Sequence, residues 1–383
     1  MNKFIYISLA NFSSKIYRDW FIEDLINLNF SIEYWDISNI FYENIIDLKT
    51  DKNVLIKEIN SFKALENSLK DYNNGGIINI VLIVSLNLQT LKVYKILNKF
   101  NVKLIFIEQG ALPIYKQNKL LKIKQIIYNP FKYLKIIFSN QLIELYKKNK
   151  FIKEIDLLFT VGGYYQNEYL NSKILSYNLN LCDFDQLKLI QNEKSLFNFK
   201  FAVFLDINAI DNPDYLMLNM KILDSELYYN TLNIFFNKLE KKFNLKIIIA
   251  AHPTTNIEKC NYNDRIILKY NTGVLVKFSE FVITHHSTSI SYAILSNKPI
   301  LSIYTNQMEA IYKNSIMRNI LALSQFLKIE SYKIDDIDFN KIKLDLNPDL
   351  YTKYKYNFLT TPSSEYMISK NIFTEAIIKN ILF

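Results

Sequence analysis

Short apolar runs of strand length alternate with amphipathic helical stretches along most of this chain, and this alternation constrains its fold more than any other feature. Helical periodicity appears over residues 15–28 and 88–100, between apolar runs. Strands that alternate with helices are joined by crossover connections, so the pattern predicts a parallel α/β sheet. The runs that we expect to be strands in the first half are 4–9, 31–35, 77–85, 103–108 and 156–161.

The second half repeats the pattern after a stretch of weaker periodicity at 179–199, which we interpret as a connector between domains. We expect strands at 201–205, 245–251, 281–284 and 299–304, and helices at 223–243 and 288–296. The predicted fold is therefore α/β, with two Rossmann-like domains that face a cleft. The predicted domains are residues 1–190 and 191–362, followed by a C-terminal helix at 363–383.

The size and the apolar content of the chain predict a globular protein. Half of its 383 residues are hydrophobic, which is ample for two cores. The longest apolar runs have about half the length of a membrane-crossing helix, and the first ten residues do not resemble a signal peptide. Cys182 and Cys260 show no spacing typical of a disulfide framework or a zinc site. We expect a cytoplasmic protein without a bound metal.

The positive charge of the chain is concentrated in one segment. Residues 111–153 contain ten lysines and a single acid, Glu144, so their net charge equals the +9 of the whole chain. The segment is also rich in Ile, Leu, Tyr and Phe, a combination that suits contact with an anionic membrane surface. A solvated lysine-rich face is the alternative. We expect no nucleic-acid partner, because the excess is confined to one segment without a recognised binding motif.

All three histidines of the chain, His252, His285 and His286, stand where an apolar strand gives way to a helical stretch. In parallel α/β sheets, ligands bind beyond the carboxyl ends of the strands. Histidine there can donate to a phosphate or exchange a proton near neutral pH. A single histidine is more often structural, but this grouping favours a binding site for a phosphate-containing ligand.

Three signatures at strand ends carry a family resemblance. They are Glu108-Gln109-Gly110, His252-Pro253, and the run from His285 to Ser289 with the sequence His-His-Ser-Thr-Ser. In this order the chain resembles the GT-B-type bacterial glycosyltransferases that use CMP-activated ulosonic acids, the sialyltransferases and capsular Kdo transferases. Those families carry an acidic-x-Gly motif, a His-Pro motif and a Ser-Ser motif. Here Gln109 stands where the family usually has a second acid.

The resemblance implies a role for each signature. The first domain would bind the acceptor, and Glu108 would be the general base for its hydroxyl, although a carboxylate at a turn can instead cap a helix. The second domain would bind the nucleotide donor. His252, held in place by Pro253, would stabilise the leaving phosphate. Ser287, Thr288 and Ser289, preceded by His285 and His286, would bind the phosphate at a helix start, or would form an ordinary N-cap.

Other motifs contribute less. Two Asp-x-Asp sequences, Asp183-Phe184-Asp185 and Asp336-Ile337-Asp338, resemble metal-binding motifs, but neither follows a clear strand, and we interpret both as surface turns. Gly162-Gly163 would let backbone approach a ligand or form a plain turn. The sequence lacks the G-x-G-x-x-G, P-loop, G-x-S-x-G and H-E-x-x-H motifs, which argues against dinucleotide oxidoreductases, P-loop NTPases, serine hydrolases and zincins.

We therefore expect a metal-independent glycosyltransferase of bacterial surface-glycan assembly, such as capsule or lipooligosaccharide. It would move a sugar from a nucleotide donor, a CMP-linked ulosonic acid, to a saccharide hydroxyl on a soluble or lipid-linked acceptor at the inner membrane. Two alternatives remain. One is a teichoic-acid-type glycerol- or ribitol-phosphate transferase with a CDP donor. The other is a non-catalytic, membrane-peripheral protein of the same fold, whose function would rest on its basic segment.

Overall fold

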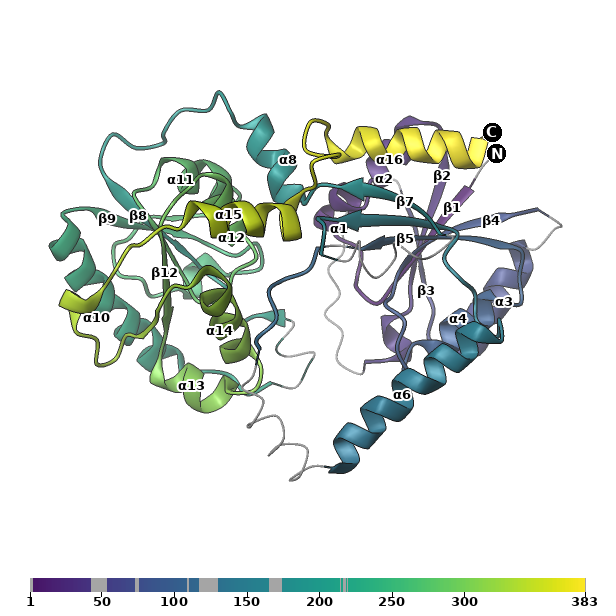
Figure 1. The fold of residues 1–383 in the computed structure, drawn as a ribbon, viewed down its shortest axis with the longest axis horizontal. Coiled ribbons are helices and arrows are strands. Elements are labelled where there is room, and N and C mark those ends of the chain that lie inside the picture. Colours follow the sequence, from purple (N-terminus) through teal and green to yellow (C-terminus); the bar gives the residue numbers. More distant parts are fainter. Residues whose placement is uncertain are drawn as a thin grey trace.

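The computed structural model describes residues 3–42, 54–72, 76–108, 110–116, 130–164, 174–213, 215, 218 and 220–382. Within them the chain forms two parallel sheets, each with helices on both faces (Figure 1). This confirms the predicted α/β fold with two Rossmann-like domains.

The first sheet has seven strands in the order β3-β2-β1-β4-β5-β6-β7. Along β1, alternate side chains point to opposite faces, because successive residues of a strand do so. Phe4 and Tyr6 pack under α1 (Ser14–Asp19), α2 (Ile22–Asn27) and α16 (Ser369–Ile377). Ile5 and Ile7 pack under α3 (Phe62–Tyr72) and α4 (Leu91–Leu97). The strands are β1 (Lys3–Ser8), β2 (Ser31–Asp36), β3 (Leu55–Glu58), β4 (Ile78–Ile83), β5 (Val102–Glu108), β6 (Leu157–Val161) and β7 (Leu175–Leu179).

The second sheet has six strands in the order β10-β9-β8-β11-β12-β13. One face packs against α10 (Ser225–Phe243) and α13 (Asn306–Tyr312). The other packs against α11 (Thr272–Phe278), α12 (Ile290–Leu295) and α15 (Pro348–Tyr354), while α14 (Ile316–Leu327) contributes to both cores. The strands are β8 (Phe201–Leu205), β9 (Lys246–Ala250), β10 (Ile267–Leu268), β11 (Val282–Thr284), β12 (Ile300–Tyr304) and β13 (Ser331–Lys333).

The chain crosses between the domains twice. After β7 it passes through α8 (Cys182–Leu189) to the second sheet, and after α15 it returns, so that α16 lies on the first domain. Figure 1 shows both crossings on the same side of the molecule. The returning segment is hydrogen-bonded to the first domain, from Gly163 N to the Tyr356 carbonyl at 2.9 Å and from Leu181 N to the Leu359 carbonyl at 2.7 Å. The predicted boundary after residue 190 falls within the first crossing.

Several elements differ from the sequence-based expectation. The predicted helix at 15–28 is two helices, with Phe21 between them in the left-handed region at φ 56°. Tyr6 Oη donates to the Trp20 carbonyl at 2.8 Å, which draws that carbonyl away from a continuous helix. The predicted connector contains α8, whose first turn carries two acids, a favourable charge for a helix start. The edge strands β3 and β7 were not predicted, since both are largely exposed and have little apolar pattern.

Candidate functional site

The second sheet has a topological switch point between β8 and β11. From β8 the chain builds outward through β9 and β10, and then crosses to β11 on the other side. The register aligns the strand ends, because Leu205 pairs with both Ala250 and Thr284. The loops after β9 and β11 therefore flank β8 at about 10 Å from each other, two strand spacings. Ligands of open α/β sheets bind at such a point, and here it carries all three histidines.

Asp206, the first residue after β8, holds the segment that follows β9. The side chain is buried, and its Oδ2 accepts a hydrogen bond from Thr255 Oγ1 at 2.8 Å. Oδ1 accepts from Tyr262 Oη and from Asn208 N, both at 3.1 Å. A buried carboxylate satisfied in this way fixes the backbone around it. The loop after β9 is thus held in one conformation relative to β8.

His252 lies at the start of that loop and is partly exposed. Thr254 N donates to His252 Nδ1 at 3.3 Å, and Thr254 Oγ1 lies 2.8 Å from the same nitrogen. Asn208 Nδ2 in turn donates to Thr254 Oγ1 at 3.0 Å. Because Nδ1 accepts from a backbone amide, the neutral ring carries its proton on Nε2. The Pro253 carbonyl accepts from Lys269 Nζ at 3.1 Å, which restrains the turn further.

His285 belongs to the core and not to the surface of the site. Its side chain is fully buried, its Nδ1 lies 2.8 Å from the Ile303 carbonyl, and its Nε2 lies 3.0 Å from Tyr228 Oη. Burial lowers the pKa of His285 to about 4, against the opposite effect of the Ile303 carbonyl and Asp206. Both ring nitrogens are occupied, so in this structure His285 supports the strand end and offers no nitrogen to a ligand.

His286 follows in the bend after β11 and differs from His285 in its exposure. It is partly exposed, but its Nδ1 is buried and has no partner among the described residues. Burial, reinforced by neighbouring His285, lowers the pKa of His286 to about 4. Of the two adjacent histidines, only His286 has a ring nitrogen without a partner among the described residues.

The turn that contains Ser287, Thr288 and Ser289 has fewer free backbone amides for a phosphate than the sequence predicts. Helix α12 begins at Ile290 and not at Thr288, and the preceding turn uses its own amides. Ser287 N donates to Thr284 Oγ1 at 3.2 Å, and Ser289 N donates to Ser287 Oγ at 3.3 Å. Thr288 is exposed, and it lines a cavity between the two domains. Its hydroxyl is thus the best placed of the three for contact with a ligand.

That cavity has a volume of about 410 Å³ and joins the carboxyl ends of the first sheet to the second domain. Ile107, Val161 and Leu179, at the ends of β5, β6 and β7, line one side, and Thr288 lines another. The remaining wall comes from α1, α2, α8 and the start of α16, with both signs of charge. Arg18 and Asp19 of α1 are paired there, with 2.6 Å between Nε and Oδ1. Polar side chains of both charges on one wall suit a polar ligand.

Asp183 is a candidate that the sequence analysis set aside. We expected Asp183-Phe184-Asp185 to be a surface turn, and this was wrong, because the residues form the first turn of α8 against the second domain. Asp183 lines the cavity and accepts a hydrogen bond from Ser291 Oγ of α12. Burial raises the pKa of Asp183, and the Ser291 bond partly offsets this. A carboxyl group with a raised pKa in a cleft suits proton transfer. The two acids at a helix start were the available signal.

Glu108 ends β5 and is partly exposed next to Ile107, which lines the cavity. Gln109, the departure from the family motif, lies outside the described residues. Gly110 follows at φ 55°, a conformation that glycine adopts without strain. Gly162 has φ 68° and faces the returning segment, so this Gly-Gly turn accommodates the protein's own backbone and not a ligand.

The structure also bears on two predicted absences. In the part of the chain that is described, no three His, Cys, Asp or Glu side chains are grouped as metal ligands. No helix in those ranges has both the length and the apolar character needed to cross a membrane.

No protein-family model matches the chain, and a search of curated proteins found no match. Similar solved structures include MurG from Acinetobacter baumannii, at 7% identity over 98% of this chain and 100% of that one, with a TM-score of 0.48. A UDP-GlcNAc 2-epimerase from Neisseria meningitidis is 13% identical over 99% and 100% of the two chains, with a TM-score of 0.43. A variant of the wall teichoic acid polymerase TagF is 10% identical over 100% and 90%, with a TM-score of 0.45.

One fold can support many unrelated reactions, so the function of this chain depends on the residues of its site and not on its fold.

Proposed function

We propose that the chain is a GT-B-type glycosyltransferase that moves a sugar from a nucleotide donor to a saccharide hydroxyl. One observation carries the proposal. Thr288, which follows β11 at the switch point of the second sheet, lines a cavity whose other walls bear charged side chains of the first domain and of α8. A donor phosphate at the strand ends and an acceptor at the opposite wall would bring their reacting atoms together between the domains.

On the donor side, His252 has the tautomer that the chemistry requires. With Nδ1 accepting from Thr254 N, the ring proton lies on Nε2, which would donate to a leaving phosphate oxygen. Donation to that oxygen stabilises the charge that develops as the glycosidic bond breaks. Pro253 and the Asn208–Thr254 contact position the ring, Thr288 would add a hydroxyl, and Ser287 and Ser289 would hold the turn that presents it.

On the acceptor side, the base that removes the hydroxyl proton would be Glu108 or Asp183. Glu108 follows from the acidic-x-Gly motif, whereas Asp183 is supported by its position on the cavity wall and its raised pKa. The variants Glu108→Gln and Asp183→Asn separate them. The variant that lacks the true base should have a much lower kcat and a nearly unchanged KM, because the proton transfer occurs in the transition state. The variant at the other carboxylate should show a changed KM or no change.

The proposed donor is a CMP-linked ulosonic acid of the sialic acid or Kdo kind. The support is the order of the three motifs along the chain. A CDP-linked glycerol or ribitol donor is the competing assignment, supported by the strand, hydroxyl-rich turn and helix of residues 281–301.

We also propose that the enzyme acts at an anionic membrane surface, on a lipid-linked acceptor. Helix α6 (Pro130–Lys148) supports this, because it extends away from the first domain (Figure 1). Phe131, Leu134 and Phe138, one face of the helix at spacings of three and four, are 85%, 60% and 64% exposed. Apolar side chains with this exposure, beside lysines, are typical of helices that lie in a membrane interface. Residues 117–129 of the basic segment lie outside the described residues.

A thermal-shift panel with CMP, CDP, UDP and GDP tests the donor assignment, because a ligand that binds only the native state raises its stability by mass action. We expect the largest shift with CMP, and expect it to disappear in His252→Ala. A larger shift with CDP would favour the phosphate transferase. The absence of a shift with any nucleotide would favour the non-catalytic alternative.

A further inference from the structure

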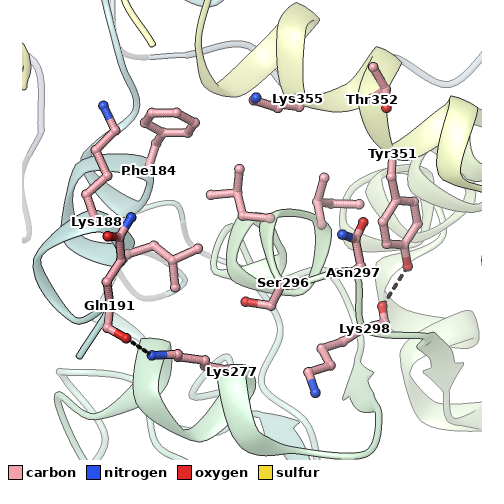
Figure 2. Close-up of a pocket in the computed structure, with 13 residues that line it drawn as sticks. Phe184, Lys188, Gln191, Lys277, Ser296, Asn297, Lys298, Tyr351, Thr352 and Lys355 are labelled. Atoms are coloured by element: carbon pink, nitrogen blue, oxygen red, sulfur yellow. Dashed lines mark hydrogen bonds between the residues drawn. The ribbon is translucent and has the colours of Figure 1, made fainter. Parts of the chain in front are cut away.

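A second cavity, of about 600 Å³, lies where α8 and α15 pack against α11 and α12 (Figure 2). Thr288 and the strand ends of the first sheet do not line it, so it is separate from the interdomain cavity. The described residues that line it include no aspartate or glutamate. They do include four lysines from four parts of the chain, namely Lys188, Lys277, Lys298 and Lys355.

The charge of these lysines is only partly compensated. Lys355 pairs with Glu365 at 2.7 Å. Lys188 Nζ donates to the Met367 carbonyl at 3.1 Å, and Lys277 Nζ donates to the Ile190 carbonyl at 3.0 Å. Carbonyl groups fix an ammonium group but do not cancel its charge. The cavity therefore has a positive potential that an anion would relieve.

Two groups at the cavity are left without a polar partner. Ser296 Oγ is buried and makes no hydrogen bond to a described residue, although it points toward the middle of the cavity in Figure 2. The Lys298 ammonium forms no hydrogen bond or ion pair with any residue of the described ranges, while its carbonyl accepts from Tyr351 Oη at 2.8 Å. Burial lowers the pKa of Lys298, against the weaker opposite effect of Glu280. A buried polar atom such as Ser296 Oγ normally has a partner, and the partly buried Lys298 ammonium faces a cavity whose described lining has no acid.

The opposite wall is apolar and contains a flat ring. Phe184 and Leu187 of α8 face Ile294 and Leu295 of α12. Lys188 Nζ lies 4.8 Å and Lys355 Nζ 5.8 Å from the centre of the Phe184 ring. The cavity thus combines an apolar surface with a cationic rim, which is the composition of a site for a small amphiphilic anion.

We propose that this cavity binds a small organic phosphate, whose phosphate group contacts Lys298 and Ser296 and whose apolar part lies against Phe184 and Leu187. The site is independent of the proposed transferase function. Its walls include α8 and α15, the two segments through which the chain crosses between the domains. A bound anion would therefore connect both crossings to the body of the second domain.

Phenyl phosphate is the probe, because it has both an anionic and a flat apolar part, and inorganic phosphate is the reference. By calorimetry on the full chain, we expect phenyl phosphate to bind more tightly than inorganic phosphate. Lys298→Gln should weaken its binding about tenfold, the scale of one charge-assisted hydrogen bond, and Ser296→Ala about threefold. Lys343→Gln, which removes an exposed lysine elsewhere on the same domain, is the matched control and should bind as the wild type does.

His252→Ala separates this site from the nucleotide site and should leave phenyl phosphate binding unchanged. The proposal is overturned if Lys298→Gln binds with wild-type affinity while keeping a wild-type melting temperature, or if His252→Ala abolishes the binding. The proposal is also overturned if phenyl phosphate does not bind while phosphatidate vesicles bind in a way that requires Lys298. The phosphate group recognised by the cavity would then belong to a lipid headgroup.

Discussion

A Cβ atom at Gly162 would lie 2.5 Å from the carbonyl oxygen of Asn357, so a glycine after β6 is what allows the returning segment to reach the first domain. Gly162 also has φ 68°, where other residues are strained. The two hydrogen bonds from Gly163 and Tyr164 to residues 356 and 357, both at 2.9 Å, depend on the same approach.

We expect Gly162→Ala to destabilise the protein by about 2–4 kcal/mol, because backbone strain and a backbone clash combine. The measurement is thermal or urea unfolding. Gly76→Ala is the matched control, since no atom lies within 4 Å of a Cβ built there, and it should change stability by less than about 0.5 kcal/mol. Equal stabilities of the two variants would contradict the close approach.

His252→Ala should lower transfer by at least about 100-fold, the scale of losing one preorganised group that stabilises developing charge. The fold should stay intact, because the ring is partly exposed and Asp206 holds the loop independently. Steady-state kinetics with a labelled donor measure the effect. Thr254→Val removes the hydroxyl that contacts the His252 ring but leaves the ring in place. It should therefore lower the rate of transfer less than His252→Ala does. Near-normal turnover in His252→Ala would remove this residue from the mechanism.

Stability should fall as the pH is lowered from about 6.5 to about 4, in part because of His285. Burial lowers the pKa of His285 to about 4, whereas an unfolded histidine has a pKa near 6.5, so the unfolded state binds the proton first. The contribution is complete above pH 6.5, and roughly 3 kcal/mol is lost by pH 4. Denaturant unfolding at several pH values measures this dependence.

The control for this dependence is His285→Gln, which should be less stable at neutral pH and should lose less stability on acidification. His286 has a similarly lowered pKa, so His286→Gln should remove a further part of the slope. Parallel pH profiles for the wild type and both variants would show that folding lowers the pKa of neither histidine.

Helix α6 should bind anionic vesicles. Replacing Phe131, Leu134 and Phe138 with serine should weaken co-sedimentation with such vesicles and impair transfer to a lipid-linked acceptor, while sparing a short soluble one. Binding should also weaken with salt, because ions screen the lysines of 111–153. Serine at Ile77 and Tyr270, which are 63% and 81% exposed, is the matched control. If α6 is only a solvated helix, the wild type will not sediment with vesicles at any salt concentration.

Transfer should continue in the presence of EDTA. Asp185 of the Asp183-Phe184-Asp185 sequence is held by Asn180 and Ser369, so this sequence does not offer the pair of free carboxylates that a metal-binding motif provides. The charge of the leaving phosphate would then rest on His252 and its neighbours. Loss of turnover on chelation, with recovery on adding Mg²⁺ or Mn²⁺, would refute this expectation.

Local patterns allowed much of this fold to be predicted. The strand at 201–205 has the predicted bounds, and α10 begins where Asp224 caps it, because strand hydrophobicity and helix caps are properties of neighbouring residues. The place of the histidines at one edge of the second sheet could also be predicted, because each follows an apolar run and a parallel sheet brings the carboxyl ends of its strands to the same edge. The exposed edge strands β3 and β7 escaped prediction, because their pairing depends on a neighbouring strand and not on their own apolar pattern.

The alternation of apolar and amphipathic stretches was enough to predict the two parallel sheets and the residues at their edges. The role of each of those residues depends on contacts that are made only in the folded protein. His285 and His286 are adjacent and chemically identical. Ile303 of β12 and Tyr228 contact the two ring nitrogens of His285, whereas Nδ1 of His286 has no partner among the described residues. Asp183 joins the candidate site because α8 packs against Ser291, more than a hundred residues away in the chain. Burial and partners such as these arise from contacts between distant segments, which no local pattern encodes.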